Sequence, residues 1–551
     1  MTIILCSLTG LKLQTSLRKL RDVYLVISLI SLGLLLRLPS LRLGLWRDEG
    51  ITYFDVLPTN LGEVVARIIH SESNPPLFYL IMDRWVRWFG SGEVVFKIPA
   101  FIFGLLLIPA VYFLGREVSD RRVGLIAAAI TAVAPEAIYY SQEARPYTLA
   151  ALLCCLVVFL YCKAITSTEH QTWYLLWFVI CAEMLLYVQY TGLLLIGSLV
   201  IITWCLWWHD RSSVKLVPFA IAFAIIFLLF IPWLPIFLSH LQAGTPWTIK
   251  EPWLTRAKVF YQNVGYYTLP LPDALKVKPL LKILEIAMSG LVLLVFGLVV
   301  RQLLYRTQRT PSRKMLLNIS EVVLCMSFVL YSMMLTFFSY SGRYMFPLTP
   351  IAWVSYSGWC VALFRYIKHR WSERRIRFSR QLILVLLGLL FIFPNFNYAL
   401  SLGNIDKSGV RSLATDLQER SLKNTVYLLS PDYLGITFAY YFRQQPVQLH
   451  GFPDWDRPEI FSPKGHAEEW QSPTLISDAE KQIQEEANKG SLKLALIQKS
   501  GIIPDLGEMR YSRANQLLSQ LKQTYPLIAK DSYPGHTESV TLYLFSLTPH
   551  E

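Results

Sequence analysis

Apolar stretches of about 20 residues recur along most of this chain, and they constrain its fold more than any other feature. They run from Leu25 to Tyr398, and none follows Tyr398. A helix of about 20 apolar residues has the length needed to cross a bilayer. Only 16% of the 551 residues are charged, against about 25% in soluble proteins. The sequence therefore predicts a polytopic α-helical membrane protein over residues 1–400.

The basic residues of the short loops predict the topology. Cytoplasmic loops retain Lys and Arg, and a cytoplasmic N-terminus places the basic clusters at 116–122, 301–314 and 365–380 on that side. This orientation predicts about 11 spanning helices. They are expected at 22–38, 98–115, 123–139, a run ending at Lys163, 173–189, 193–208, 216–237, 280–300, 319–338, 345–364 and 381–398.

Residues 39–97 form the first extracytoplasmic loop in this topology. The segment from Pro75 to Phe89 has about 15 residues, which is short for a span, and it carries three charged side chains. It therefore suits a helix lying in the membrane interface. Trp46 and the run from Arg37 to Arg42 are expected to anchor the loop there, because Trp and Arg favour that region.

After residue 400 the pattern becomes that of a soluble domain. Alternating strands and helices predict a small extracytoplasmic α/β domain over residues 401–551. Strands are expected at Thr425–Ser430, Val447–Phe452, Leu492–Gln498 and Ser539–Ser546, and helices at Gly409–Arg420, Pro431–Arg443, Asp478–Asn488 and Ser512–Thr524.

The charge distribution weighs against a nucleic-acid partner. The net charge is +14, yet the residues after Tyr398 carry 15 basic and 18 acidic side chains. The basic excess therefore lies in the short loops of the membrane part, and no contiguous basic face appears. All eight cysteines precede residue 398, in or beside apolar segments and without the spacing of a metal site.

Two groups in the first loop carry candidate chemistry. Asp48 and Glu49 follow Trp46 directly, and His70 and Asn74 precede two adjacent prolines. A carboxylate at the interface can take the proton from an acceptor hydroxyl as a general base. The alternatives are a solvated surface pair for the acids and an ordinary turn for His70.

Two arginines lie on later turns of the same side. Arg145 precedes Pro146 and Tyr147, and Arg343 precedes Tyr344. Both oppose the positive-inside bias, and a guanidinium group suits a phosphate through its paired donors. Snorkelling at a helix end is the alternative. Acids and arginines on one face fit a membrane-bound anionic substrate, such as a polyprenyl-phosphate sugar, attacked from water in one inverting step.

Three motifs resemble those of a known superfamily. Trp46-Arg47-Asp48-Glu49, His70-Ser-Glu-Ser-Asn-Pro-Pro-Leu77 and Gln142-Glu-Ala-Arg-Pro-Tyr147 occur in this order. Over residues 20–400 the chain resembles the GT-C superfamily of membrane glycosyltransferases, in particular the group with protein O-mannosyltransferases and aminoarabinose lipid A transferases. The resemblance implies an integral membrane enzyme that takes a polyprenyl- or dolichyl-phosphate-linked sugar on the non-cytoplasmic face.

The resemblance also implies roles for individual residues. Asp48, with Glu49 beside it, matches the family's proposed base, and Arg145 and Arg343 match its donor-phosphate ligands. Some members bind a divalent metal near the acid; only Glu49 and His70 could ligate one here, so no metal site is assigned. The chain has no room for the luminal β-trefoil of the protein mannosyltransferases, which weighs against protein as the acceptor. A chain of this type is expected in a bacterial plasma membrane, with membrane lipids around it and a lipid, glycan or protein acceptor.

Two rival functions predict other features. A transporter or lipid-linked-sugar flippase without catalysis predicts internal repeats and charges near the bilayer midplane. The sequence shows no repeat, and its candidate charges cluster at one surface. A non-catalytic scaffold would not require Asp48, Arg145 and Arg343 together.

Overall fold

The computed structural model divides the chain into two compact units. The helical unit comprises Met1–Pro39, Lys97–Pro235 and Ile249–Leu400; the sheet unit comprises Ser40–Phe96, Ile236–Thr248 and Ser401–Glu551. The first loop therefore belongs to the same compact unit as the C-terminal residues. The division into a catalytic domain 1–400 and an accessory domain 401–551 stays a functional prediction. The structure describes residues 2–58, 60–167, 169–209, 215–243, 342–370, 393–402, 406–420, 422–444, 447–456, 467–500 and 507–548, with a few residues between 252 and 294.

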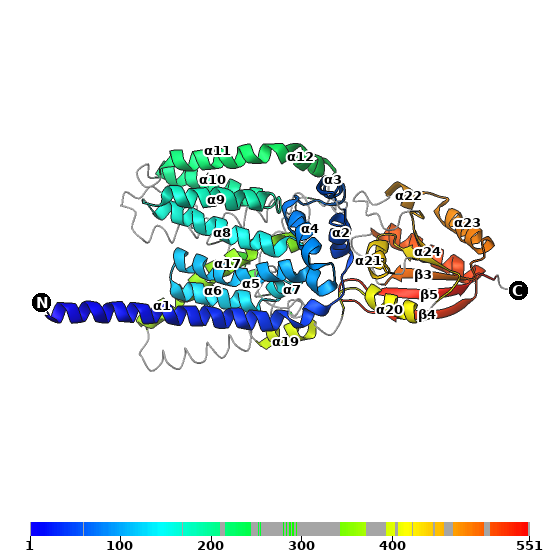
Figure 1. The fold of residues 1–551 in the computed structure, drawn as a ribbon, viewed down its shortest axis with the longest axis horizontal. Helices are drawn as coiled ribbons and strands as arrows, with labels where there is room; N and C mark the ends of the chain where they lie inside the picture. The colour runs from blue at the N-terminus through cyan, green and yellow to red at the C-terminus, as the bar shows by residue number, and fades with distance from the viewer. Residues whose placement is uncertain are drawn as a thin grey trace. The chain divides into compact units, whose positions relative to one another are not determined.

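Helices of the helical unit follow most of the expected apolar stretches. α8 packs against α9 and against the short helix η3, while α6 packs against α1 and α17 (Figure 1). The described elements are α1 (Thr2–Arg37), α5 (Glu93–Val118), α6 (Arg121–Val133), α7 (Pro135–Tyr140), α8 (Tyr147–Thr166), α9 (Gln171–Leu186), α10 (Gly192–His209), α11 (Leu216–Phe230), η2 (Ile231–Trp233), η3 (Gly342–Leu348), α17 (Thr349–Arg370) and α19 (Phe393–Leu402).

Four described helical stretches are long and apolar enough to cross a membrane. They are Leu20–Arg42, Glu93–Val118, Tyr147–Thr166 and Leu216–Gln242, and α9 and α10 are shorter apolar helices. In the span of α8 72% of the residues are buried, against 22% in the last stretch, so α8 is central to the unit. The total of about 11 spans stays a prediction. The helix expected at 319–338 and most of those expected at 280–300 and 381–398 lie outside the described residues.

Prolines interrupt two helices that the hydropathy pattern predicts as continuous. The helix expected over 123–139 is α6 and α7, separated at Ala134, whose backbone is extended (φ −63°, ψ 132°). A residue before proline avoids the helical region, because its backbone clashes with the proline ring, and Pro135 follows Ala134. The helix expected over 216–237 is likewise interrupted by η2, which contains Pro232, before α12 (Leu234–Ala243).

A mixed five-stranded sheet organises the C-terminal part of the sheet unit. Its order is β2-β1-β3-β5-β4, with β1 parallel to β2 and β3, and β5 antiparallel to β3 and β4. Figure 1 shows β5 between β3 and β4. The strands are β1 (Thr425–Ser430), β2 (Leu449–Gly451), β3 (Lys493–Lys499), β4 (Leu527–Tyr533) and β5 (Val540–Ser546). The four expected strands are confirmed to within two residues at each end, and β4 is an additional edge strand.

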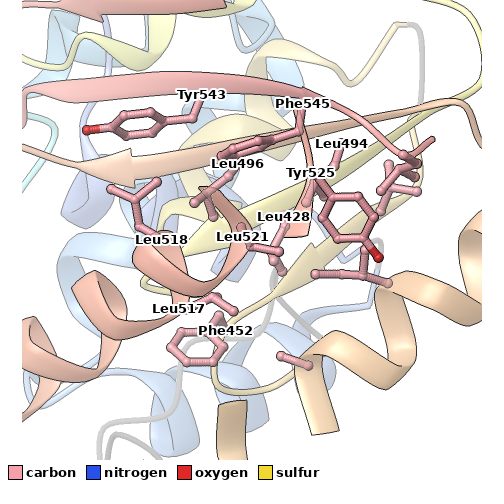
Figure 2. Packing of buried hydrophobic residues seen from close by; sticks show 14 of the residues in the cluster. Leu428, Phe452, Leu494, Leu496, Leu517, Leu518, Leu521, Tyr525, Tyr543 and Phe545 are labelled. Carbon is pink, nitrogen blue, oxygen red and sulfur yellow. The ribbon is translucent and has the colours of Figure 1, made fainter. Parts of the chain in front are cut away.

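Each face of the sheet has its own hydrophobic core. Leu428 of β1 packs with Leu517 and Leu521 of α24 on one face (Figure 2). Leu429 packs with Phe438 of α21 on the other face, because successive strand side chains point to opposite faces. The helices are α20 (Val410–Arg420), α21 (Leu434–Tyr441), α22 (Ala467–Gln471), α23 (Leu475–Asn488) and α24 (Gly507–Thr524).

The first loop adds short helices to the sheet unit. α2 packs against α21. The interfacial helix expected from Pro75 is α4, which begins just after two prolines and ends at Gly90 (φ 85°). The elements are η1 (Pro39–Arg42), α2 (Arg47–Asp55), α3 (Leu61–Ser71) and α4 (Leu77–Phe89).

Candidate active site

The acid motif forms the first turn of α2. The Trp46 backbone is extended, and its N–H donates a hydrogen bond to Glu49 Oε2 at 3.4 Å. A carboxylate in this position satisfies a free N–H and interacts favourably with the positive end of the helix. Asp48 is 6% exposed and Glu49 is fully buried. Neither acid is therefore a solvated surface group.

Arg47 orients Asp48. Its Nε donates to Asp48 Oδ1 at 3.1 Å. The guanidinium carbon lies 4.9 Å from the centre of the Tyr433 ring and 5.8 Å from that of Trp46. Cations are attracted to the faces of aromatic rings, so Trp46 and Tyr433 hold Arg47, and Arg47 in turn restricts the carboxylate.

Glu49 forms a buried ion pair with a residue distant in sequence. Lys407 Nζ donates to Glu49 Oε2 at 3.3 Å, and the two side chains are 2% and 0% exposed. Nearby, Tyr441 Oη accepts a hydrogen bond from the Leu45 N–H at 2.7 Å. Burial first, and the Glu93 carboxylate second, raise the pKa of Tyr441 well above its usual value. The Tyr441 hydroxyl therefore stays protonated beside the acid motif.

The other candidates of the first loop lie on separate elements. His70 is exposed on the last turn of α3, whereas Asn74 is 2% exposed and its Nδ2 donates to Tyr79 Oη at 3.4 Å. Asn74 thus fixes the start of α4. The catalytic role of His70 stays a prediction.

The donor-side candidates lie in the helical unit, at the start of α8 and in η3, and these two elements pack together. Arg145 lies on the turn between α7 and α8, is 5% exposed, and its N–H donates to the Glu143 carbonyl at 2.7 Å. The rings of Tyr147 and Tyr344 are edge to face, with centres 6.3 Å apart. The structure therefore places Tyr344 of η3 beside Tyr147 at the start of α8.

Arg37, which the sequence predicts as an anchor at the membrane interface, has a structural role inside the protein. Its guanidinium group is fully buried and donates to Ser141 Oγ at 3.0 Å and to the carbonyls of Ala132, Thr131 and Gly33 at 2.8 to 3.0 Å. Gln142 Nε2 donates to the Arg37 carbonyl at 3.0 Å. Arg37 thus braces the turn that carries Arg145. In the sequence, the only sign of this structural role is a lone arginine at the end of an apolar run.

The described residues do not suggest a preformed metal site. Within those ranges, no three His, Cys, Asp or Glu side chains gather to hold an ion. No catalytic step is therefore derived through a metal. The acid motif and the arginine group belong to different units, so their convergence stays a prediction.

Comparison with known proteins identifies the fold. Residues 73–236 match the family of dolichyl-phosphate-mannose-protein mannosyltransferases. ArnT from Cupriavidus metallidurans in the apo state is similar in structure, with a TM-score of 0.55 and 13% identity, over 94% of this chain and 97% of that one. The chain therefore shares the fold of this solved protein. No curated protein matches it in a sequence comparison.

A second solved structure shares this fold. The Archaeoglobus fulgidus oligosaccharyltransferase, solved with Zn and sulfate, aligns with a TM-score of 0.51 and 14% identity, over 94% of this chain and 72% of that one. The range that matches the family model begins just before Asn74 and includes Arg145 and Tyr147. Asp48 precedes that range, so its role rests on the motif order and on its surroundings in the structure.

Proposed function

We propose that this protein is a glycosyltransferase of the GT-C superfamily that moves a sugar from a polyprenyl-phosphate donor to an acceptor hydroxyl or amine. The reaction takes place on the non-cytoplasmic face, in a bacterial plasma membrane. The observation that carries the proposal is the buried Asp48 on the first turn of α2, oriented by Arg47. The family model that matches residues 73–236 is named for enzymes using dolichyl-phosphate mannose, which supports a lipid-phosphate donor.

The proposed chemistry is a single displacement. The acceptor oxygen attacks the anomeric carbon while the Asp48 carboxylate takes its proton. The bond from the anomeric carbon to the phosphate oxygen breaks, and the electron pair leaves with the lipid phosphate. Arg145 and Arg343 stabilise the charge that grows there. Attack and departure on opposite sides invert the anomeric centre.

A carboxylate-to-amide pair of variants tests this assignment. Membranes with the wild type, Asp48→Asn or Asp478→Asn are incubated with radiolabelled polyprenyl-phosphate sugars and acceptor lipids. Asp478 is exposed on α23, so its variant is the matched control. We expect Asp48→Asn to lower transfer by about 100-fold or more, since general bases contribute about 10²–10⁴-fold. Equal transfer by Asp48→Asn and the control would remove Asp48 from the mechanism.

Donor binding is measured separately. Arg145→Ala should raise the KM for the donor, because a guanidinium contact to the phosphate is lost. An unchanged KM and kcat would contradict the role of Arg145.

If the wild type instead moves intact lipid-linked sugar between leaflets without transfer, the flippase alternative is correct.

A further inference from the structure

Within the sheet unit, the acid-bearing helix α2 lies directly against the C-terminal helix α21. A Cβ atom added at Gly50 would approach Ile436 Cγ2 to 2.8 Å, which is closer than such atoms pack. The ring of Tyr53 meets that of Tyr440 edge to face, with centres 4.8 Å apart. Only glycine at position 50 allows this separation of the two helices.

Residues on both sides of α2 are also tied to the C-terminal part. Before α2, the Gly44 N–H donates to Asp406 Oδ1 at 3.0 Å, and Arg411 donates to the Arg42 carbonyl at 2.7 Å. After α4, Arg411 pairs with Glu93 at 3.2 Å. The segment 406–411 thus holds both ends of the first loop.

Lys407 itself is fixed by the sheet. Its carbonyl accepts hydrogen bonds from the Thr537 and Glu538 N–H groups at 2.9 and 3.0 Å. The next residue, Ser408, donates from Oγ to Glu538 Oε2 at 2.8 Å. The backbone of Lys407 is therefore set by the turn before β5, and its ammonium group reaches Glu49 from a rigid support.

We propose that the C-terminal α/β part of the sheet unit positions the acid motif, with Lys407 as the positioning residue that acts through Glu49 on Asp48. The inference rests on the proposed function. Glu49 and Asp48 are adjacent on one helical turn, so a rotation of α2 that releases Glu49 also moves the Asp48 carboxylate. A buried charge pair resists that rotation, because separating it leaves an uncompensated buried charge.

Three lysine variants of the full-length protein test the role of Lys407. Lys407→Met removes the charge at similar length, Lys407→Arg keeps it, and Lys481→Met on an exposed position of α23 is the control. We expect Lys407→Met to lower kcat by about 10- to 100-fold, as misplacement of a catalytic group does, with the donor KM unchanged. Lys407→Arg should recover most of the activity, and Lys481→Met should match the wild type. Wild-type kcat in Lys407→Met, or a loss that Lys407→Arg does not rescue, overturns the proposal.

A second pair of variants tests the contact between α2 and α21 without touching a charge. Gly50→Ala should lower kcat. Adding Ile436→Ala should restore part of the lost kcat, because it removes the Ile436 Cγ2 atom that the new methyl group would meet. Gly92→Ala is the control, since nothing lies within 4 Å of the added atom. No loss with Gly50→Ala, or a loss that the double variant does not relieve, contradicts the proposal.

Hydrogen exchange separates this inference from the proposed function. In Lys407→Met the amides of 47–55 should exchange faster than in the wild type, whether or not transfer is detected. If Asp48→Asn transfers normally but exchange rises in Lys407→Met, the proposed function fails and the positioning of α2 stands. Unchanged exchange in Lys407→Met overturns the positioning of α2.

Discussion

Several buried charged side chains of this protein are held by specific polar contacts. Arg37 binds one hydroxyl and three carbonyls. Asp83 is fully buried on α4 and pairs with Arg87 at 2.6 Å. Burying a charge is costly unless it is paired and hydrogen-bonded. Such residues therefore fix local geometry, and their loss is expected to disturb the turns that they join.

The first prediction at this scale concerns Arg37. Arg37→Met should destabilise the folded protein by about 3 kcal/mol or more, because several buried acceptors lose their donor and each costs about 1–3 kcal/mol. It should also raise the donor KM, since Ser141 and Gln142 belong to the turn of Arg145. Thermal unfolding in detergent and transfer kinetics measure the two effects.

Leu35→Met is the matched control for Arg37. This neighbour is 64% exposed on α1, so its replacement by the same residue should leave both quantities unchanged. A donor KM in Arg37→Met equal to that of the control would show that Arg37 does not support the Arg145 turn.

At the scale of elements, small residues and prolines decide where helices break and how closely they approach. A Cβ atom at Gly115 would lie 2.8 Å from the Gly124 Cα, and one at Gly124 would lie 2.4 Å from the Tyr112 carbonyl oxygen. α5 and α6 therefore meet backbone to backbone, as small residues allow in membrane helices. Pro135 follows the end of α6, and Pro232 lies where α11 changes to the 3-10 turn η2, although hydropathy alone continues both helices.

The glycine contact gives the second prediction. Gly124→Val should force α5 and α6 apart and lower the midpoint of thermal unfolding, because the clash is with backbone and cannot be relieved by a rotamer change. Overpacking of this kind costs about 1–3 kcal/mol. Gly197→Val on α10, where nothing lies within 4 Å of an added atom, is the control. Equal unfolding midpoints for the two variants would refute the close contact.

The sheet shows which elements could be predicted from sequence and which could not. β1 and β3 are short buried apolar runs, and their burial on both faces gives a clear local pattern. β4 was not predicted. Its residues are half-buried or exposed and include Lys530 and Asp531, so it resembles a polar loop. Its pairing with β5 defines it as a strand, and that pairing is not a local property.

For the whole molecule, the grouping of the first loop with the C-terminal residues joins the acid motif to the sheet unit. The topology expected from the basic loops places both parts outside the cytoplasm. A transporter would not require its first loop to pack with the C-terminal residues. The linkage is therefore consistent with an enzyme whose acid motif is held by its soluble domain.

A third prediction tests the sidedness. Ala66→Cys on α3 and Ser519→Cys on α24 are both exposed positions. In intact cells each should react with a membrane-impermeant maleimide above the background of the native cysteines. Glu169→Cys, after α8, should react only after the membrane is opened. If only Glu169→Cys were labelled in intact cells, the topology would be the reverse of the expected one.

The sequence by itself determined the membrane class, most helix positions, four strands, the motif order and the candidate residues. These depend on local composition and on spacing within about 20 residues. Only the tertiary structure decided that Arg37 is buried and that Glu49 pairs with Lys407, 358 positions away. No local pattern marks such a pair, because one lysine among many near a domain boundary looks like any other solvated charge. Its significance arises when the chain folds and excludes water from both partners.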